Sequence, residues 1–212
     1  MKGFIWFTLI ALAITTCATF AAPEPAIVQP PGKWTVDATF THPRQLIMRN
    51  GPGGQAQRYW YVILTVTNNT GRDVDFYPRC DMMTDTFQIR PAGWHVPAAV
   101  FGRVKELHLT AYPFLERLEK TSSKLLEGEN NAKDLALIWP DFDPKANAIK
   151  IFVGGLSNEM AIVKHPVRQD EAGDPVLVFL RKTLELGYNI KGDPSLRSNM
   201  DLTHVSTRWI MR

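Results

Sequence analysis

Two aspartates at the spacing D-x-D are the residues best placed to perform chemistry in this chain. Asp141 and Asp143 lie in the segment DFDPKAN, and closely spaced aspartates are typical ligands of Ca²⁺. An EF-hand loop would continue with an oxygen ligand, a glycine and a final glutamate, whereas this chain has Lys145, Ala146 and Phe152 there. Aspartate before proline is also ordinary turn chemistry. The segment therefore predicts either a solvated turn or a Ca²⁺ site on the two aspartates, and we expect no other cofactor.

The rest of the sequence contains no motif of a catalytic site. Its five histidines form neither a zinc-binding pair nor an H-E-x-x-H motif, and no G-x-S-x-G nucleophile elbow is present. Cys80, Met82, Met83 and the later His95 are soft ligands that suit Cu(I), although such residues also fill cores. We predict no catalytic residue and no enzymatic activity, and a hydrolase site assembled in space is the least favoured alternative.

The first residues have the pattern of an export signal. Lys2 precedes the apolar run at residues 4–16, which is shorter than a membrane span, and small residues allow cleavage after Ala21. Residues 1–21 are therefore predicted to be a signal peptide, and the mature protein to be periplasmic or secreted, without a membrane span. Cys17 leaves a lipid anchor as an alternative, although Thr16 stands where a lipobox has Gly, Ala or Ser.

Charge and length limit the remaining classes. The formal charge is +3 at pH 7, and no run of Lys or Arg exceeds two residues, so we expect no nucleic-acid partner. Residues 22–33 are rich in proline and predict a linker, and residues 34–212 are long enough for one domain with its own core. After signal cleavage Cys80 is the one cysteine left, and it is expected to be a small buried residue near a strand end.

Alternation of apolar and polar residues predicts a series of short strands. They lie in residues 34–48, 59–66, 74–76, 85–90, 134–139, 147–154, 175–185 and 206–211, with 184–190 as an extension or partner of 175–185. Both faces of 59–66 are apolar, which predicts a central strand covered on both sides or buried under an inserted segment. Asn68–Gly71 has turn chemistry and should join this strand to 74–76 as a hairpin.

A helical pattern interrupts the strands at residues 99–129. Apolar residues recur there at helical spacing, before and after Pro113, and Gly128 is a suitable end for the second segment. The sequence thus predicts an all-β fold, an antiparallel sandwich, with a helical insertion at 99–129.

The hairpin sequence VILTVTNNTG at residues 62–71 resembles an element of immunoglobulin-like domains in exported bacterial proteins. Later blocks resemble a family of uncharacterised exported bacterial proteins, and they lie at residues 128–134, 139–143, 152–157, 180–184 and 208–212. This resemblance implies an immunoglobulin-like, or telokin-like, β-sandwich and an exported location. It implies no activity and no functional residues.

These patterns favour a non-enzymatic protein-binding or structural module of the cell envelope. Its expected partner is an envelope or extracellular protein, and the insertion at 99–129 is the expected contact. The alternative is a module that binds a cation or a glycan through Asp141, Asp143 and exposed aromatic residues.

Overall fold

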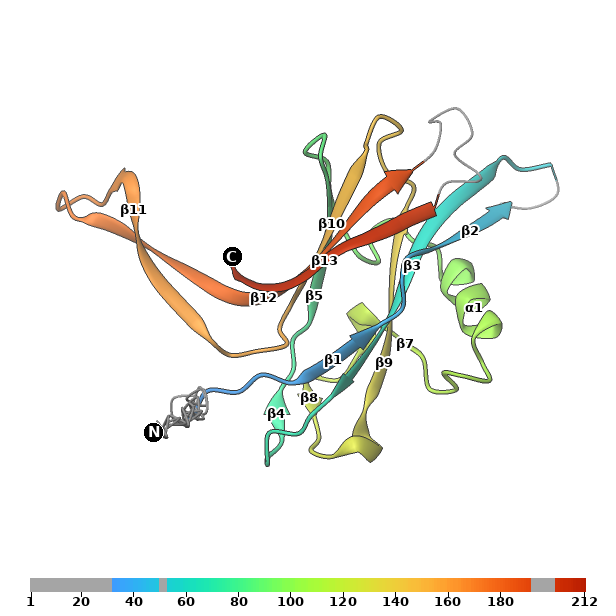
Figure 1. Ribbon diagram of the computed structural model, residues 1–212. Helices are drawn as coiled ribbons and strands as arrows, with labels where there is room; N and C mark the ends of the chain where they lie inside the picture. The colour runs from blue at the N-terminus through green and yellow to red at the C-terminus, as the bar shows by residue number, and fades with distance from the viewer. Residues whose placement is uncertain (1–31, 50–52, 192–200) are drawn as a thin grey trace, which may run out of the picture. The chain divides into compact units, whose positions relative to one another are not determined.

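Two β-sheets make up most of the protein in a computed structural model that describes residues 32–49, 53–191 and 201–212 (Figure 1). The first sheet has the order β1-β3-β9-β7, and β2 also pairs with β3. Its strands are β1 (Asp37–Phe40), β2 (Arg44–Arg49), β3 (Ala56–Thr67), β7 (Glu116–Arg117) and β9 (Lys133–Pro140). All of its pairings are antiparallel except that between β7 and β9.

The second sheet has the order β11-β12-β10-β5-β6, with β13 also pairing with β12, and it is antiparallel throughout. Its strands are β5 (Arg79–Thr84), β6 (Ile89–Pro91), β10 (Ala148–Gly154), β11 (Met160–Gln169), β12 (Pro175–Lys191) and β13 (Asp201–Met211). Outside these sheets lie α1 (Ala98–Leu107), the strand pair β4 (Val74–Asp75) and β8 (Lys124–Leu125), and the 3₁₀ turns η1 (Leu118–Lys120) and η2 (Glu129–Asn131). The predicted all-β class is confirmed.

The main hydrophobic core lies between the two sheets. Alternate residues of β3, among them Trp60 and Val62, pack in one buried cluster with Ile149 and Ile151 of β10 and Leu186 of β12. Because successive side chains of a strand point to opposite faces, the period-2 patterns in these segments position one apolar face of each sheet toward the other. Each fully buried side chain of this size contributes about 1.5–3 kcal/mol to folding.

The opposite face of β3 is also buried. Tyr61 and Ile63 pack in a second cluster with Val100 and Val104, which lie four residues apart on one side of α1. The prediction that residues 59–66 form a strand covered on both faces is confirmed, and the inserted segment supplies the second cover.

The prediction of a second helix in the insertion, after Pro113, is wrong. Residues 108–129 contain β7, β8, the 3₁₀ turn η1 and the start of η2 instead of an α-helix. Leu115, Leu118 and Leu125 are each buried, but Phe114 is 81% exposed, so the apolar residues do not share one helix face. Their spacing arises because separate short elements each place one leucine in a core, and Pro113 interrupts any continuous helix.

The predicted hairpin of residues 59–66 and 74–76 is also wrong in its pairing. β4 pairs with β8, whereas the neighbours of β3 are β1, β2 and β9. The buried amide of Asn68 donates hydrogen bonds to the carbonyl oxygens of Arg72 and Leu125, which directs the chain away from β3. In the predicted strand 85–90, only Ile89 and Arg90 are in a strand, because a turn with Phe87 at φ 64° precedes them.

Other parts of the sequence interpretation are confirmed or lie outside the described residues. The predicted strands 34–48, 134–139 and 147–154 are present, although β1 and β2 divide the first of them. Cys80 is buried in β5, and burial raises the pKa of its thiol well above the usual range. The predicted signal peptide at 1–21 and the linker through residue 31 are not described. No helix of the described residues is long and apolar enough to cross a membrane.

Tyr188 should give the stability of the protein a specific alkaline dependence. Its buried hydroxyl has no hydrogen-bond partner among the described residues, and burial raises its pKa to about 12. In the unfolded protein this tyrosine loses its proton near pH 10, and its ionisation favours the unfolded state. The free energy of unfolding is therefore unaffected by Tyr188 ionisation below pH 10 and falls as the pH rises towards 12. We expect Tyr188→Phe to be at least as stable as the wild type at pH 8 and to lose less stability by pH 11.

Urea denaturation at both pH values would measure this difference. Tyr59 and Tyr61 also have raised pKa values, but they are shared by both proteins and so do not affect the comparison. Parallel pH profiles for the wild type and the variant would contradict the prediction.

Candidate functional site

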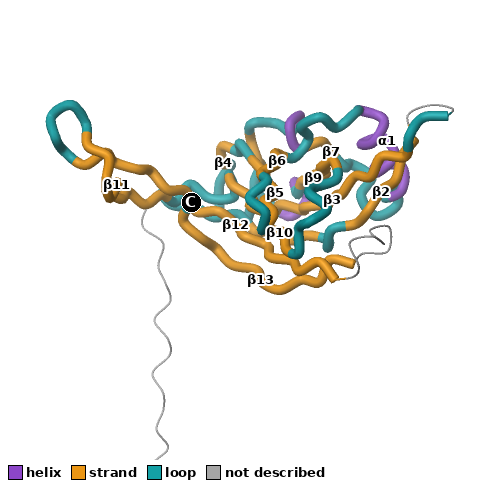
Figure 2. The backbone as a smooth tube through the Cα atoms, turned by 90° about the horizontal axis from the view of Figure 1, so that it is seen from above, coloured by secondary structure: helices purple, strands orange, loops and turns teal. Residues whose placement is uncertain are grey.

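A two-stranded arm extends from the second sheet (Figures 1 and 2). β12 is 17 residues long, and its second half pairs with β10 on one side and with β13 on the other. From Pro175 to Leu180 its partner is β11 alone. We call residues 160–181 the arm. Figure 2 shows the arm projecting from the rest of the sheets, on the left of that view.

Local sequence explains why the arm is a hairpin. Its turn is closed by Asp170, whose Oδ1 accepts hydrogen bonds from the amides of Ala172 and Asp174, each at 3.0 Å. Gly173 has φ 85°, a conformation that favours glycine. The pairing is irregular between Lys164 and Gln169. There the ring Nδ1 of His165 accepts hydrogen bonds from the amides of Val167 and Arg168, which stabilises a bulge around Pro166.

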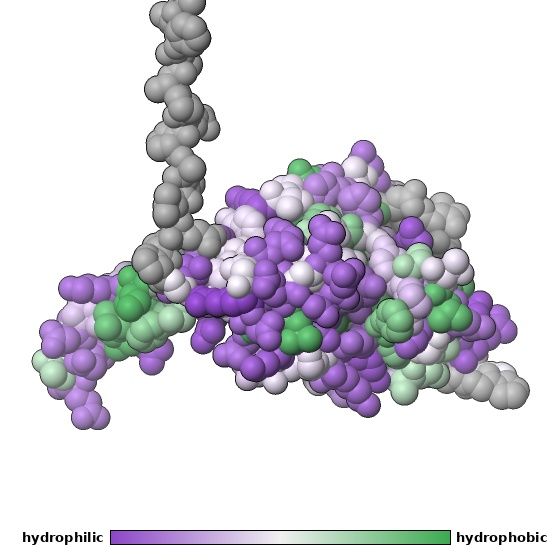
Figure 3. Space-filling model, turned by 90° about the horizontal axis from the view of Figure 1, so that it is seen from below, coloured by the Kyte–Doolittle hydropathy of each residue, from purple (hydrophilic) through white to green (hydrophobic). Residues whose placement is uncertain are grey.

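The arm exposes apolar side chains on both of its faces. Met160, Ile162, Leu177 and Phe179 alternate along the two strands and share one face, on which Ile162 lies directly opposite Phe179. These four side chains are 47–59% exposed. Val163, 42% exposed, lies on the other face opposite the half-buried Val178. Figure 3 shows the resulting hydrophobic area on the arm, to the left of the other described residues.

The two strands of the arm carry positive charge and no carboxylate. β11 contains Lys164 and Arg168, and the arm's part of β12 ends at Arg181, next to Lys182. The acidic residues Asp170, Glu171 and Asp174 are confined to the turn. Neither Lys164 nor Arg168 forms an ion pair within the described residues. The apolar faces of the arm are therefore bordered by cations.

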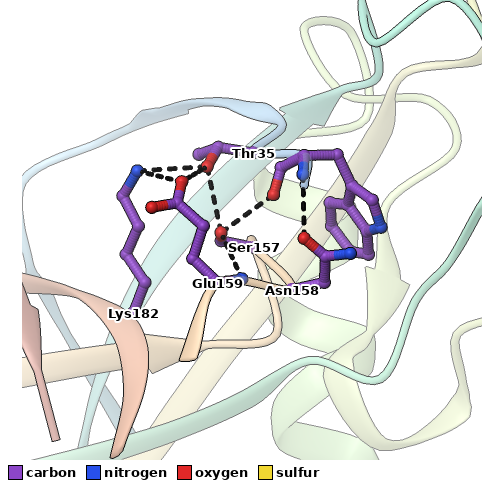
Figure 4. Close-up of polar contacts among 6 residues, drawn as sticks. Thr35, Ser157, Asn158, Glu159 and Lys182 are labelled. Carbon is purple, nitrogen blue, oxygen red and sulfur yellow. Dashed lines mark hydrogen bonds and ion pairs between the residues drawn. The ribbon is translucent and has the colours of Figure 1, made fainter. Parts of the chain in front are cut away.

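A polar network anchors the base of the arm (Figure 4). Lys182 Nζ lies 2.6 Å from Glu159 Oε1 and donates to Thr35 Oγ1 at 3.2 Å, while Thr35 Oγ1 also lies 2.9 Å from Glu159 Oε1. Ser157 Oγ donates to the carbonyl oxygen of Trp34 at 2.8 Å. Together these contacts fix the loop before β11, and Lys182 of β12, to the segment before β1.

The ion pair in this network predicts a pH-dependent contribution to stability. The hydrogen bond from Lys182 is the largest cause that lowers the pKa of Glu159, and it outweighs the raising effect of burial. A carboxylate with a lowered pKa stabilises the fold above its unfolded pKa and loses that effect as the pH falls through the folded pKa. We therefore expect Glu159→Gln to be less stable than the wild type by about 0.5–1 kcal/mol at pH 7, with a difference that shrinks in acid.

Urea denaturation across acidic and neutral pH would measure this difference. Glu106→Gln is the matched control, because Glu106 pairs with Arg103 on the exposed surface of α1 and should contribute little. A Glu159→Gln difference that is independent of pH would contradict the assignment.

The two aspartates of the predicted Ca²⁺ site already contact protein donors. Asp141 Oδ1 accepts from Trp60 Nε1 at 2.9 Å, and its Oδ2 pairs with Arg58 at 3.3 Å. Asp143 accepts from the hydroxyl of Thr86 at 2.7 Å and from the amide of Lys145. The described residues contain no group of three His, Cys, Asp or Glu side chains that could hold a metal. Ca²⁺ binding at Asp141 and Asp143 stays a prediction, to be tested by melting with and without Ca²⁺.

Alternation in the sequence predicts the strand at 175–185 but not its partner at 160–169, so the arm was not predicted. The Lys-His-Pro sequence interrupts the alternation of β11. A usable signal was present, since the apolar runs AIV and PVLVFL flank the turn-forming sequence DEAGD. The predicted insertion also exposes apolar residues, notably Leu109 and Phe114, but they lie in irregular segments rather than on a paired face.

Comparisons of the chain with protein-family models, with curated proteins and with solved structures found no match.

Proposed function

We propose that this protein is an exported, non-enzymatic protein-binding module of the cell envelope, with an immunoglobulin-like β-sandwich that presents the arm to a partner protein. The observation that carries the proposal is the alignment of exposed Ile162, Leu177 and Phe179 on one face of a projecting hairpin. Exposed apolar residues are ordinary when scattered, but a contiguous group typically marks a contact surface. The two packed sheets, whose pairings are antiparallel except that of β7 with β9, support the immunoglobulin-like assignment.

The chemistry of the arm defines the partner. An isolated two-stranded hairpin is only marginally stable in water, so docking would remove exposed apolar surface and hold the hairpin. Because both faces are apolar, the occupant that fits is a protein with an apolar groove that encloses the hairpin, rather than a flat surface. Lys164 and Arg168 border those faces, so the groove should have an acidic rim.

Site-specific photo-cross-linking in intact cells would test the proposal. A photoreactive amino acid at Ile162 or at Phe179 is expected to label one and the same protein. The control position is Phe114, which is more exposed than either residue and lies within the insertion at 99–129. Labelling from Phe114 but not from the arm would show that the insertion is the contact, and no labelling from the arm would overturn the proposal. Labelling of a second copy of the chain would replace the envelope partner with self-association.

The export part of the proposal has its own test. Sequencing of the N-terminus of the mature protein should begin at Ala22. A lipid-modified Cys17 at the N-terminus would replace this assignment with a lipid anchor.

Charge on the arm should govern how fast the partner binds. Lys164→Glu is expected to slow association by roughly tenfold at low salt, because it would place a like charge beside an acidic rim. Stopped-flow or surface-based kinetics with the cross-linked partner, at low and at physiological salt, would measure the change. Lys145→Glu alters a lysine outside the arm and should have little effect. Equal effects of the two substitutions would show that only net charge matters.

A further inference from the structure

An arginine-lined cleft lies at the base of the arm, on the outer face of the second sheet. It has a volume of about 460 Å³, within the range of sites for small ligands. Arg79 of β5, Arg181 of β12 and Arg212 contribute guanidinium groups, and Asp81 is the single carboxylate-bearing side chain of its lining. The side chains at the cleft therefore carry an excess of positive charge.

Two of these arginines are held side by side by the backbone. The amide of Arg181 donates to the carbonyl oxygen of Arg212 at 2.7 Å, and the amide of Arg212 donates to that of Arg181 at 3.0 Å. This is the geometry of a directly opposed pair in an antiparallel ladder, in which the two side chains share a face. Like charges placed directly opposite each other destabilise a sheet, so a bound anion would relieve an unfavourable contact.

The three guanidinium groups differ in how they are engaged. Arg212 lies over the ring of Phe152, 4.2 Å from its centroid, and 3.7 Å from Asp81 Oδ2, so its position is fixed. Arg79 and Arg181 form no ion pair with any carboxylate of the described residues. Arginine is suited to bind phosphate and carboxylate groups through two parallel hydrogen bonds.

We propose that this cleft binds a small oxyanion of at least two negative charges, such as a phosphate ester or a polycarboxylate. Arg79 and Arg181 bind the anion. Arg212, which is held in place by its contact with the ring of Phe152, supplies the third guanidinium group. The hydroxyl of Thr183 also lines the cleft, but it donates to the carbonyl oxygen of Arg181 at 3.1 Å, so the guanidinium groups supply the donors for the anion. The site shares Arg181 with the arm, whereas Arg79 and Arg212 lie outside the arm, and none of the three arginines is needed to bury the apolar faces.

Isothermal titration calorimetry at constant ionic strength would test the site. The probes are pyrophosphate and citrate, with chloride as the baseline, and at least one of them is expected to bind with a stoichiometry of one. Whichever probe binds more tightly shows whether the site prefers phosphate or carboxylate groups. Arg79→Gln with Arg181→Gln should weaken binding by about 10- to 100-fold, because two charge-assisted contacts are lost.

Matched variants separate a built site from general attraction by charge. Arg103→Gln removes an exposed arginine on α1 and should leave the affinity unchanged. Asp81→Asn should tighten binding, because it removes the negative charge nearest to Arg212. Phe179→Ser removes apolar surface from the arm without adding a charge beside Arg181, so it should leave anion binding intact and make failure of the arm proposal and failure of this one distinguishable. No binding of either probe, or equal weakening by Arg103→Gln, would overturn the site.

Discussion

Phe179→Asp is expected to lower the affinity of the protein for its cross-linked partner by about 100-fold. Aromatic residues at the centre of an interface commonly account for 2 kcal/mol or more of binding free energy, and docking would also bury an unpaired carboxylate. Phe179 is 59% exposed in the free protein and lies directly opposite Ile162 at the middle of the apolar face. The substitution should therefore remove the contact without disturbing the core between the sheets.

Titration of the partner with purified wild-type and variant protein would measure this change, and thermal melting would confirm that the variant is folded. Phe114→Asp is the matched control, since Phe114 is 81% exposed and lies outside the arm. Its affinity should equal that of the wild type. A folded Phe179→Asp variant that binds with unchanged affinity would show that the apolar face is not the contact.

Gly155→Ala should be among the most destabilising single-methyl additions in this protein. Gly155 has φ 84°, and a Cβ atom there would clash with the carbonyl oxygen of Tyr77, which is backbone and cannot rotate away. The left-handed conformation alone costs about 1–2 kcal/mol for a residue with a side chain. With the backbone contact added, we expect a loss of about 3 kcal/mol or more and a melting temperature lower by roughly 6–12 °C.

Gly71→Ala separates the cost of the left-handed conformation from the cost of the backbone contact. Gly71 has φ 80°, but nothing lies within 4 Å of the position of its Cβ, so this variant should show the conformational effect alone. Urea denaturation of both variants would give the difference, which measures the close approach of the two backbone segments. Equal losses would mean that the chain adjusts around Gly155 at no extra cost.

The sequence was most informative where a strand has one clear environment. Alternation located the strands around Val62 and Ile151, because each places every second side chain in the core between the sheets. It was also sufficient to predict that β3 is covered twice, since Tyr61 and Val62 point to opposite faces and both are apolar.

Helical spacing was misleading between residues 114 and 126. Leucines three or seven residues apart suit a helix, but Leu118 and Leu125 reach the main core from separate short elements while Leu115 joins the second cluster. Tertiary packing determines the secondary structure of such a segment, and local spacing in a single sequence does not reveal that packing. For the same reason the register that pairs β4 with β8, 50 residues away, was not predictable from the turn at Asn68.

The arm and the cleft could not be predicted as sites. The alternating strand at 175–185 predicts that Leu177 and Phe179 face an apolar environment, but only the topology shows that β10 stops before reaching them. The cleft depends on Arg79, Arg181 and Arg212, which are distant in sequence and meet because β5, β10 and β12 are neighbours.

The continuity of β12 has a mechanical consequence. A force that pulls the arm outward along its axis acts on a strand whose other half is bonded on both sides, to β10 and to β13. The hydrogen bonds of antiparallel strands run perpendicular to the strands, so such a load would shear many of them at once rather than open them one by one. Tension applied to the arm would therefore pass directly into the strand that is paired on both sides.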